Sequence, residues 1–373
     1  HMTQRRVAAP RPGHLTGAML ALCVLLAGCG EAAKLPVSAG TGPEPVLPAP
    51  AGTLLPTVNI APAIGWPDGR VPLAAPGTQV VAFARGLDHP RWLHVLPNGD
   101  VLVAESNAPA TPDDGKGLKG WISGLVMKRA GAGVPSANRI TLLRDSDGDG
   151  VADLRNVLLA GLNSPFGMAL VGDTLYVANT NGLMAFPYKA GDTQITAKGK
   201  ELTKFNAKAP NNHWTRNLAA SPDGKKIYIS VGSNSNIAEN GIESENGRAM
   251  VFEYDIAKDK KIPYAIGLRN PVGLDWDSRG RLWTVVNERD MLGSDMVPDY
   301  LALVEFGADY GWPQHYWGGF TDHRVSPPKP EKREYERRPD YALGAHTAPL
   351  GLAAATGNSL PAVFANGMFV GQH

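Results

Sequence analysis

The sequence contains only two cysteines, Cys23 and Cys29, both inside its first thirty residues. Once that segment is removed, no thiol is left, which excludes disulfides, cysteine zinc sites and cysteine nucleophiles. An excess of one charge is also lacking, since 36 Lys and Arg face 35 Asp and Glu. The overall charge therefore gives no sign of a nucleic-acid or anionic-membrane partner.

The N-terminus reads as a targeting segment. The initial His-Met is typical of a cloning scar and is excluded from fold reasoning. A basic region (Arg5, Arg6 and Arg11) precedes an apolar run over 15–27, which is too short to span a bilayer comfortably. The run ends in Leu-Ala-Gly-Cys, which resembles a bacterial lipobox with Cys29 as the lipidated residue. The alternative is an ordinary signal peptide with an incidental cysteine.

These features predict three regions. Residues 1–29 are a scar plus a lipoprotein signal peptide. Ten of the 31 prolines fall within 30–76, so residues 30–77 are expected to form a semi-extended tether. Residues 78–373 are expected to fold. The prediction is a periplasmic protein attached to the outer membrane through its lipid alone.

A sequence motif of two apolar strands joined by a turn occurs five times. The strands have period-two β-branched and aromatic residues, and their turns contain Gly, as in β-hairpins. No helical periodicity separates the copies, so the pattern predicts an all-β fold whose blades surround an axis. The copies are HPRWLHVLPNGDVLVAES (89–106), SPFGMALVGDTLYVANT (164–180), HWTRNLAASPDGKKIYISVGS (213–233), NPVGLDWDSRGRLWTVVNE (270–288) and APLGLAAATGNSLPAVFANGMFVGQH (348–373).

An acidic loop, DSDGDGVAD, predicts a calcium site. Alternating aspartates repel one another unless a cation binds, and hard oxygen ligands suit Ca²⁺. The alternative is a solvated acidic turn, and a bound ion is expected to be structural. The candidate ligands are Asp145, Asp147, Asp149, the Val151 carbonyl and Asp153.

Two blade entrances carry candidate functional residues. His213 opens the third hairpin, where an imidazole can serve as a base near neutral pH, and Arg216 follows it. Arg269 and Asn270 open the fourth hairpin in the same register and offer donors to a carboxylate. Taken alone, each of these residue types is more often an ordinary surface or hydrogen-bonding residue.

Acidic residues follow the fourth hairpin. Glu288, Asp290 and Asp295 can ligate a hard cation or simply pair with neighbouring arginines. The aromatic segment 312–320 (WPQHYWGGF) is a candidate for stacking on a sugar, although packing at a blade edge is favoured.

Taken together, the order H-x-x-R, G-x-R-N-P-x-G, E-x-D and Y-G-W-P resembles the soluble PQQ-dependent aldose and sorbosone dehydrogenases. The most specific stretches are GLDHPRWLHVLPNGDVLVAE, LLRDSDGDGVAD, GLRNPVGLDWD, NERDMLGSDMVPD and DYGWP. The resemblance runs from about Val80 to the end and is strongest to the sorbosone dehydrogenase type. It implies a six-bladed β-propeller, of which about five blades are present.

The resemblance also implies roles for particular residues. His213 is expected to be the general base, while Arg216, Arg269 and Asn270 are expected to contact PQQ. Asn234 stands near the position of a cofactor-contacting Gln in the relatives. A calcium ion beside PQQ is expected at Glu288 and Asp290, where this chain departs from the carbonyl ligands of the glucose-oxidising relatives.

The resemblance further implies a sixth blade. The chain ends at FVGQH inside a strand, whereas the relatives continue into another blade with more basic cofactor contacts. We therefore expect either a C-terminally truncated propeller or one completed by another chain, and weak or absent PQQ binding by this chain alone.

Three functions remain open. The first is oxidation of an aldose or sorbosone-like sugar, with electrons passing to a cytochrome or quinone. The second is a calcium-dependent lactonase-type propeller, for which Glu105, Asn163 and Asp295 are possible metal ligands. The third is a non-catalytic lipoprotein that binds sugars or proteins, since propellers support all three.

Overall fold

The computed structural model describes residues 32–52, 62–110, 129, 131–356 and 359–373. The segment predicted to be a signal peptide, with Cys29, lies outside the described residues. None of the described helices is long and apolar enough to cross a bilayer. The few helical turns are α2 (Val37–Gly40), η1 (Ile242–Glu245), η2 (Pro330–Glu334) and η3 (Ala362–Phe364).

Three four-stranded antiparallel sheets follow one another along the chain. Each begins with one of the predicted hairpins. The first is β2 (Pro90–Val95), β3 (Val101–Glu105), β4 (Arg139–Arg144) and β5 (Leu154–Leu159). The second is β6 (Met168–Val171), β7 (Thr174–Asn179), β8 (Gly182–Pro187) and β9 (Lys200–Lys204). The third is β10 (Arg216–Ala220), β11 (Lys226–Val231), β12 (Met250–Asp255) and β13 (Lys260–Ile266).

The fourth sheet is larger, and the last predicted hairpin follows it. The fourth sheet is β14 (Pro271–Trp276), β15 (Leu282–Val286), β16 (Pro298–Leu303), β19 (Tyr341–Ala345) and β1 (Thr41–Gly42). An excursion between β16 and β19 holds β17 (His315–Tyr316) and β18 (Phe320–Thr321). The final hairpin pairs β20 (Pro349–Ala354) with β21 (Met368–Gln372).

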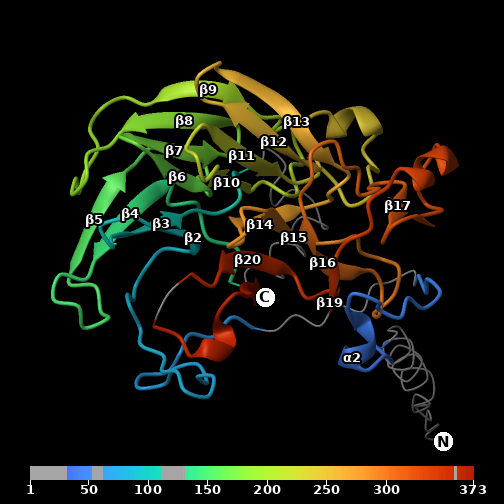
Figure 1. Cartoon of the computed structure of the whole chain (residues 1–373), viewed down its shortest axis with the longest axis horizontal. Helices are drawn as coiled ribbons and strands as arrows, with labels where there is room; N and C mark the ends of the chain where they lie inside the picture. The colour runs from blue at the N-terminus through green and yellow to red at the C-terminus, as the bar shows by residue number, and fades with distance from the viewer. Residues whose placement is uncertain (1–31, 53–61, 111–128, 130, 357–358) are drawn as a thin grey trace, which may run out of the picture.

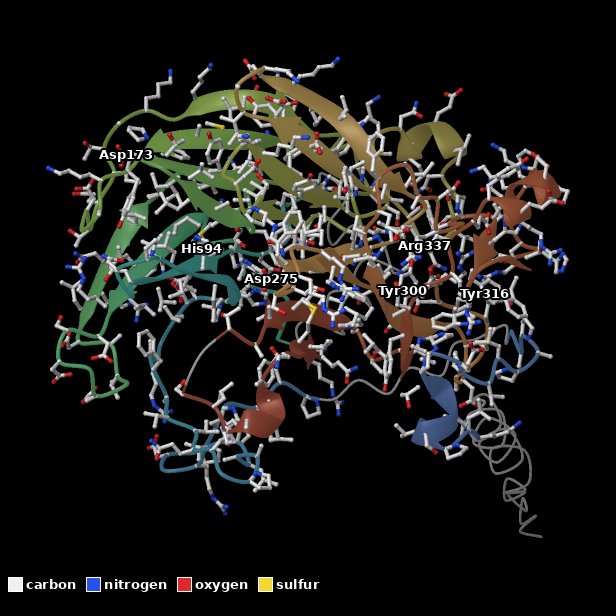
Figure 2. The ribbon with its side chains drawn as sticks, in the orientation of Figure 1. His94, Asp173, Asp275, Tyr300, Tyr316 and Arg337 are labelled. Atoms are coloured by element: carbon white, nitrogen blue, oxygen red, sulfur yellow. The ribbon has the colours of Figure 1, made fainter. Side chains whose placement is uncertain are left out.

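The sheets are arranged as propeller blades. The inner strands β2, β6, β10, β14 and β20 lie near the middle of the fan, and β5, β9 and β13 lie at its periphery (Figure 1). Asp275 of β14 lies near the middle, whereas Asp173 of the β6–β7 turn lies toward the edge (Figure 2). The predicted all-β propeller is confirmed, with four blades and a fifth hairpin among the described residues.

Period-two alternation lets one strand serve two cores. On β7, Leu175 and Val177 pack in the cluster between the first and second blades. Tyr176 and Ala178, on the other face, pack in the cluster between the second and third blades. Successive side chains of a strand point to opposite faces, so both faces of an inner blade are covered. Burying one large apolar side chain in this way contributes about 1.5–3 kcal/mol.

A fourth cluster fills the axis. Phe166, Trp214 and Val272 are buried together, with Trp92 and Leu350 packed against them. Since these residues come from the starts of five inner strands, their contact brings those strand starts to one place.

Part of the segment 30–77, which was expected to be a tether, packs on the fourth blade. Residues 41–42 form β1, which pairs with the outer edge of β19 in the fourth blade. The backbone N–H groups of Lys34 and Leu35 donate to Asp295, and Glu44 pairs with Arg338 at 2.7 Å. The free edge of β19 presents unpaired backbone groups, which a short strand can satisfy. The folded part therefore begins before Thr78, the expected boundary.

Candidate functional site

A cavity of about 310 Å³ opens where the third and fourth blades begin their inner strands. This volume lies at the lower end of the usual range for small-molecule sites. The turn between β19 and β20 completes its wall. The cavity is lined by His213, Arg269, Asn270, Asn287, Glu288, Asp290, Asp299, His346 and Ala348. The structure therefore brings five of the sequence-predicted site residues together: His213, Arg269, Asn270, Glu288 and Asp290.

The hydrogen bonds of His213 determine which ring nitrogen carries the proton. Nδ1 lies 3.0 Å from the Ser233 carbonyl oxygen and 2.9 Å from Ser233 Oγ. The Ser233 hydroxyl donates its hydrogen to the Ser235 carbonyl at 2.6 Å, so it presents only lone pairs to the ring. Nδ1 must therefore be the donor, and the neutral ring keeps its lone pair on Nε2.

The surroundings of His213 keep the ring neutral. Burial, together with the positive charges of Arg269 and Arg248, lowers the pKa of His213 well below its usual value. A neutral imidazole with a free Nε2 is a competent proton acceptor at neutral pH.

Gly232 permits the third and fourth blades to meet at this point. A Cβ atom on this residue would lie 2.3 Å from Asn270 Oδ1 and 2.6 Å from His213 Cβ. Asn270 Oδ1 is buried and has no hydrogen-bond partner in the described structure. A buried acceptor without a partner is costly, so this atom is suited to a donor supplied by a ligand.

Arg269 spans the back of the cavity. Its Nη1 donates to the carbonyl oxygens of Asn287 and Glu288, at 3.1 and 2.6 Å. Nε and Nη2 donate to Asn236, and Nη2 also reaches Asp290 Oδ2 at 3.3 Å. Arg269 itself is buried, but the side chain of its partner Asp290 is 57% exposed. The guanidinium is therefore fixed by backbone groups and paired with one carboxylate at the cavity.

His346 was not anticipated from the sequence. Its Nδ1 lies 3.6 Å from Asp290 Oδ1, and Nε2 lies 3.0 Å from the Gly293 carbonyl oxygen. The interaction with Asp290 raises the pKa of His346 to about 9. Asp290 consequently sits between two cations, Arg269 and His346.

Besides Asp290, two acidic residues line the cavity, one predicted and one missed. Glu288 pairs with Arg289 through Nε at 2.9 Å, and both side chains are buried. Asp299, which the sequence reasoning missed, accepts from the backbone N–H groups of Glu288 and Ala348. Burial raises the pKa of Asp299 to about 6. No signal in the sequence separates Asp299 from other strand aspartates.

Arg216 and Asn234 lie behind the cavity and do not line it. Arg216 is fully buried, and its terminal nitrogens donate to protein acceptors that include the His213 carbonyl. The Asn234 side chain donates to the Lys208 carbonyl at 2.7 Å. The expected contacts of these two residues with a cofactor stay predictions.

Arg91 was also missed by the sequence reasoning. It is the extra residue in a register shift between β2 and β3, a type of bulge that redirects a side chain. Its guanidinium lies over the Trp214 ring at 5.3 Å, and Nε is buried without a partner. Burial lowers the pKa of Arg91, as expected for a cation without a carboxylate beside it. The Arg-Trp pair inside the first repeat was the available signal.

The predicted calcium loop is partly assembled. Oxygen atoms of Asp145, Asp147 and Asp149 all lie within 4.8 Å of one another. Asp153 instead accepts hydrogen bonds from Ser146 N and Oγ. The Val151 side chain is exposed. Within the described ranges, this trio is the one group of three His, Cys, Asp or Glu residues close enough to share an ion.

The residues considered for a lactonase-type metal are dispersed. Glu105 accepts from Arg139 and Thr141 in the first blade, and Asp295 accepts from the N-terminal segment. Neither these two nor Asn163 lines the cavity. In the aromatic segment 312–320, Trp312, Tyr316 and Trp317 are buried, as the packing interpretation expects, whereas Phe320 is exposed.

Comparisons with known proteins agree with the fold. A family model described as TrAA12-like matches residues 125–298. The holo form of the pyranose dehydrogenase PQQ domain from Coprinopsis cinerea is 18% identical, with a TM-score of 0.62, over 80% of this chain and 75% of that chain. The iodide structure of a Trichoderma reesei carbohydrate-active enzyme of family AA12 is 17% identical, with a TM-score of 0.59, over 88% and 78% of the two chains.

A calcium structure of that Trichoderma reesei family is also similar, at 18% identity and a TM-score of 0.58, over 77% of this chain and 75% of that chain. An uncharacterized protein of Borreliella burgdorferi is 22% identical over 222 residues, which is 57% of each chain. The chain thus spans little more than half the length of this curated relative. The resemblance seen in the sequence is confirmed at the level of the propeller fold.

Proposed function

We propose that this protein is a PQQ-dependent oxidoreductase that oxidises an aldose or a sorbosone-like sugar. One observation carries the proposal. His213, whose neutral ring donates from Nδ1 and keeps its lone pair on Nε2, lines the same cavity as Arg269 and Asn270 from the next blade. A base beside a fixed positive charge is the arrangement needed to remove a proton while negative charge develops nearby.

The residues around the cavity suit an anionic cofactor that both accepts and donates hydrogen bonds. Asn270 Oδ1 offers an unused acceptor at the cavity. Arg91 lies over the Trp214 ring and does not line the cavity. Arg269 and His346 supply positive charge. Asn270, Arg269 and His346, which line the cavity, would hold PQQ, whose chemistry is to accept the hydride. Similar solved propellers include a PQQ domain in its holo form, which supports this choice of cofactor.

The chain's own residues perform three tasks in this proposal. His213 Nε2 accepts the proton of the substrate hydroxyl, and the low pKa of His213 keeps it ready. Arg269, held rigid by backbone carbonyls, stabilises negative charge without moving. Asn270 orients a donor group at Oδ1. Arg216 supports His213 from behind through its backbone carbonyl.

Calcium is proposed at the loop of Asp145, Asp147 and Asp149, where it would be structural. A second calcium beside Glu288 and Asp290 has less support, because Arg289, Arg269 and His346 already neutralise those carboxylates. We also propose that the protein is periplasmic, is anchored by the lipid on Cys29, and passes electrons to a cytochrome or quinone.

The test is a titration of the chain with PQQ in the presence of Ca²⁺, followed by dye reduction with a panel of aldoses. We expect saturable binding of PQQ. His213→Gln should retain PQQ and lose dye reduction, while Arg269→Gln should bind PQQ more weakly. Dye reduction at the original rate by His213→Gln would show that the base is assigned wrongly. Proton release from lactones without dye reduction would support the hydrolase instead.

A further inference from the structure

One peptide group beneath His213 is held on both of its sides. It joins Ser233 to Asn234 in the loop after β11. Its carbonyl oxygen accepts from His213 Nδ1 at 3.0 Å and from Arg248 Nη2 at 2.8 Å. Its N–H, on Asn234, donates to Glu245 Oε2 at 2.7 Å. The plane of this peptide therefore cannot rotate without breaking bonds to two charged side chains.

The two side chains that hold the peptide come from one short turn. Glu245 ends η1, and the backbone N–H of Arg248 donates to the Glu245 carbonyl at 2.9 Å. Both are buried, at 6% and 2% exposure. Arg248 also donates through Nε to the Gly232 carbonyl at 2.6 Å and through Nη2 to the His213 carbonyl at 2.9 Å. Charges are costly to bury, so this placement calls for a role beyond filling space.

We propose that Glu245 and Arg248 are positioning residues that hold the Ser233–Asn234 peptide so that His213 exists as the Nδ1–H tautomer. A carbonyl oxygen can only accept, so a fixed carbonyl beside Nδ1 obliges that nitrogen to keep the hydrogen. Nε2 then stays the proton acceptor of a ring that lines the cavity. Where partners of a histidine fix its tautomer, losing them disturbs its chemistry while the ring itself remains in place.

The groups that face the His213 ring support the same arrangement. Arg269 and Asp290 approach it from the fourth blade, and Arg248 approaches it from the turn after η1. Neither arginine can accept a hydrogen from the ring. The hydrogen bonds of the ring run from Nδ1 to the carbonyl and hydroxyl oxygens of Ser233, and Arg248 donates to the same carbonyl.

The molecule contains its own matched control in Arg216. Arg216 and Arg248 are both buried and both donate to the His213 carbonyl, to the Asn206 carbonyl and to Asn211 Oδ1. They differ in that Arg248 also donates to the Ser233 and Gly232 carbonyls, whereas Arg216 donates to the Thr215 carbonyl instead. Loss of a buried guanidinium is therefore common to variants of either residue, whereas loss of the Ser233 contact belongs to Arg248 variants.

The experiment is ¹⁵N NMR of the chain labelled at histidine, without cofactor. Signals of His213 are those that disappear in His213→Gln. We expect a single Nδ1–H tautomer in the wild type and in Arg216→Gln, and a mixture of both tautomers in Arg248→Gln. Circular dichroism and thermal melting establish that each variant is folded. A folded Arg248→Gln that keeps the single tautomer overturns the proposal.

A second variant, Arg248→Lys, and turnover assays also test the proposal. If Arg248→Gln does not fold, Arg248→Lys keeps the charge but cannot donate to the same set of acceptors, and it is expected to shift the tautomer balance in the same direction. A folded Arg248→Lys with an unchanged tautomer also overturns the proposal. In turnover assays, Arg248→Gln should lower kcat by about tenfold or more, with a smaller change in KM.

The catalytic consequence rests on the proposed function, but the tautomer measurement does not. Mixed tautomers in Arg248→Gln, with no aldose oxidation by the wild type, would support the positioning role and contradict the dehydrogenase. Aldose oxidation by the wild type, with a single unchanged tautomer in Arg248→Gln, would support the dehydrogenase and contradict the positioning role.

Discussion

His346 Nδ1 lies 3.6 Å from Asp290 Oδ1, and this interaction raises the pKa of the imidazole to about 9. A histidine whose pKa is raised in the folded state stabilises the fold fully below about 6.5, and that contribution is lost as the pH rises through about 9. Both side chains are partly exposed, at 40% and 57%, so solvent screening keeps the contribution small. The more direct consequence is a positive charge at the cavity at neutral pH.

The first prediction concerns this pair. Asp290→Asn removes the carboxylate charge, so the pKa of His346 should fall from about 9 toward 6.5. NMR titration of the His346 ring measures the change. Glu305→Gln, which removes a carboxylate paired with Arg337 instead, should leave the pKa of His346 near 9. A pKa of His346 that stays near 9 in Asp290→Asn would rule out the ion pair as its cause.

The second prediction concerns the contact between the third and fourth blades. Gly232→Ala places a methyl group where Asn270 Oδ1 and His213 Cβ already lie. We expect the free energy of unfolding to fall by about 1–3 kcal/mol, as for other overpacked sites. Urea unfolding measures this loss, and PQQ titration should show weaker binding. Gly40→Ala, which meets open space, should change stability by less than about 0.5 kcal/mol. Equal stability of Gly232→Ala and the wild type would contradict the close approach.

The third prediction concerns Asp299. Its pKa of about 6 lies above the ordinary 3.8 because of burial, so ionisation is disfavoured in the folded state. The contribution of Asp299 to the free energy of unfolding is therefore largest below about pH 3.8 and is lost as the pH rises through about 6. The change amounts to about 3 kcal/mol at most.

Denaturant unfolding of the wild type and of Asp299→Asn between pH 4 and about 7 tests this. The variant should gain stability relative to the wild type as the pH rises, because its amide does not ionise. A difference between the two proteins that is constant across this range would show that Asp299 titrates normally.

The fourth prediction concerns the acidic loop. Ca²⁺ that binds only the folded state raises its stability, by about 2.7 kcal/mol when its concentration is 100 times Kd. We expect Ca²⁺ to raise the Tm of the wild type and to bind more weakly to Asp147→Asn and Asp149→Asn. Asp153→Asn is the control, because Asp153 contacts Ser146 and does not join the trio. Calcium affinities that are equal in Asp147→Asn and the wild type would leave the loop as a solvated turn.

The site was only partly predictable from the sequence. His213 and Arg269 were placed at one end of the propeller because every inner strand starts there, and the cavity contains both. Asp299, His346 and Arg91 could not be found in this way. Each owes its position to a neighbour from a different strand, and no local pattern records which strand becomes that neighbour.

Arg216 shows that spacing along the chain can also mislead. Its spacing from His213 suggested that both side chains line one cavity. Instead, β10 begins at Arg216, whose side chain donates to carbonyl groups of the preceding loop. Sequence spacing gives the end of a blade at which a residue lies, but packing decides whether its side chain faces the cavity or the wall.

Period-two apolar runs with glycine turns were enough to determine the hairpins and their arrangement as blades, because alternation and turn chemistry act over a few residues. Which groups meet at the cavity, and which nitrogen of His213 holds a proton, depended on the tertiary structure. Those properties arise from charges and hydrogen bonds between segments far apart in the chain, whose distances exist only after the blades have packed.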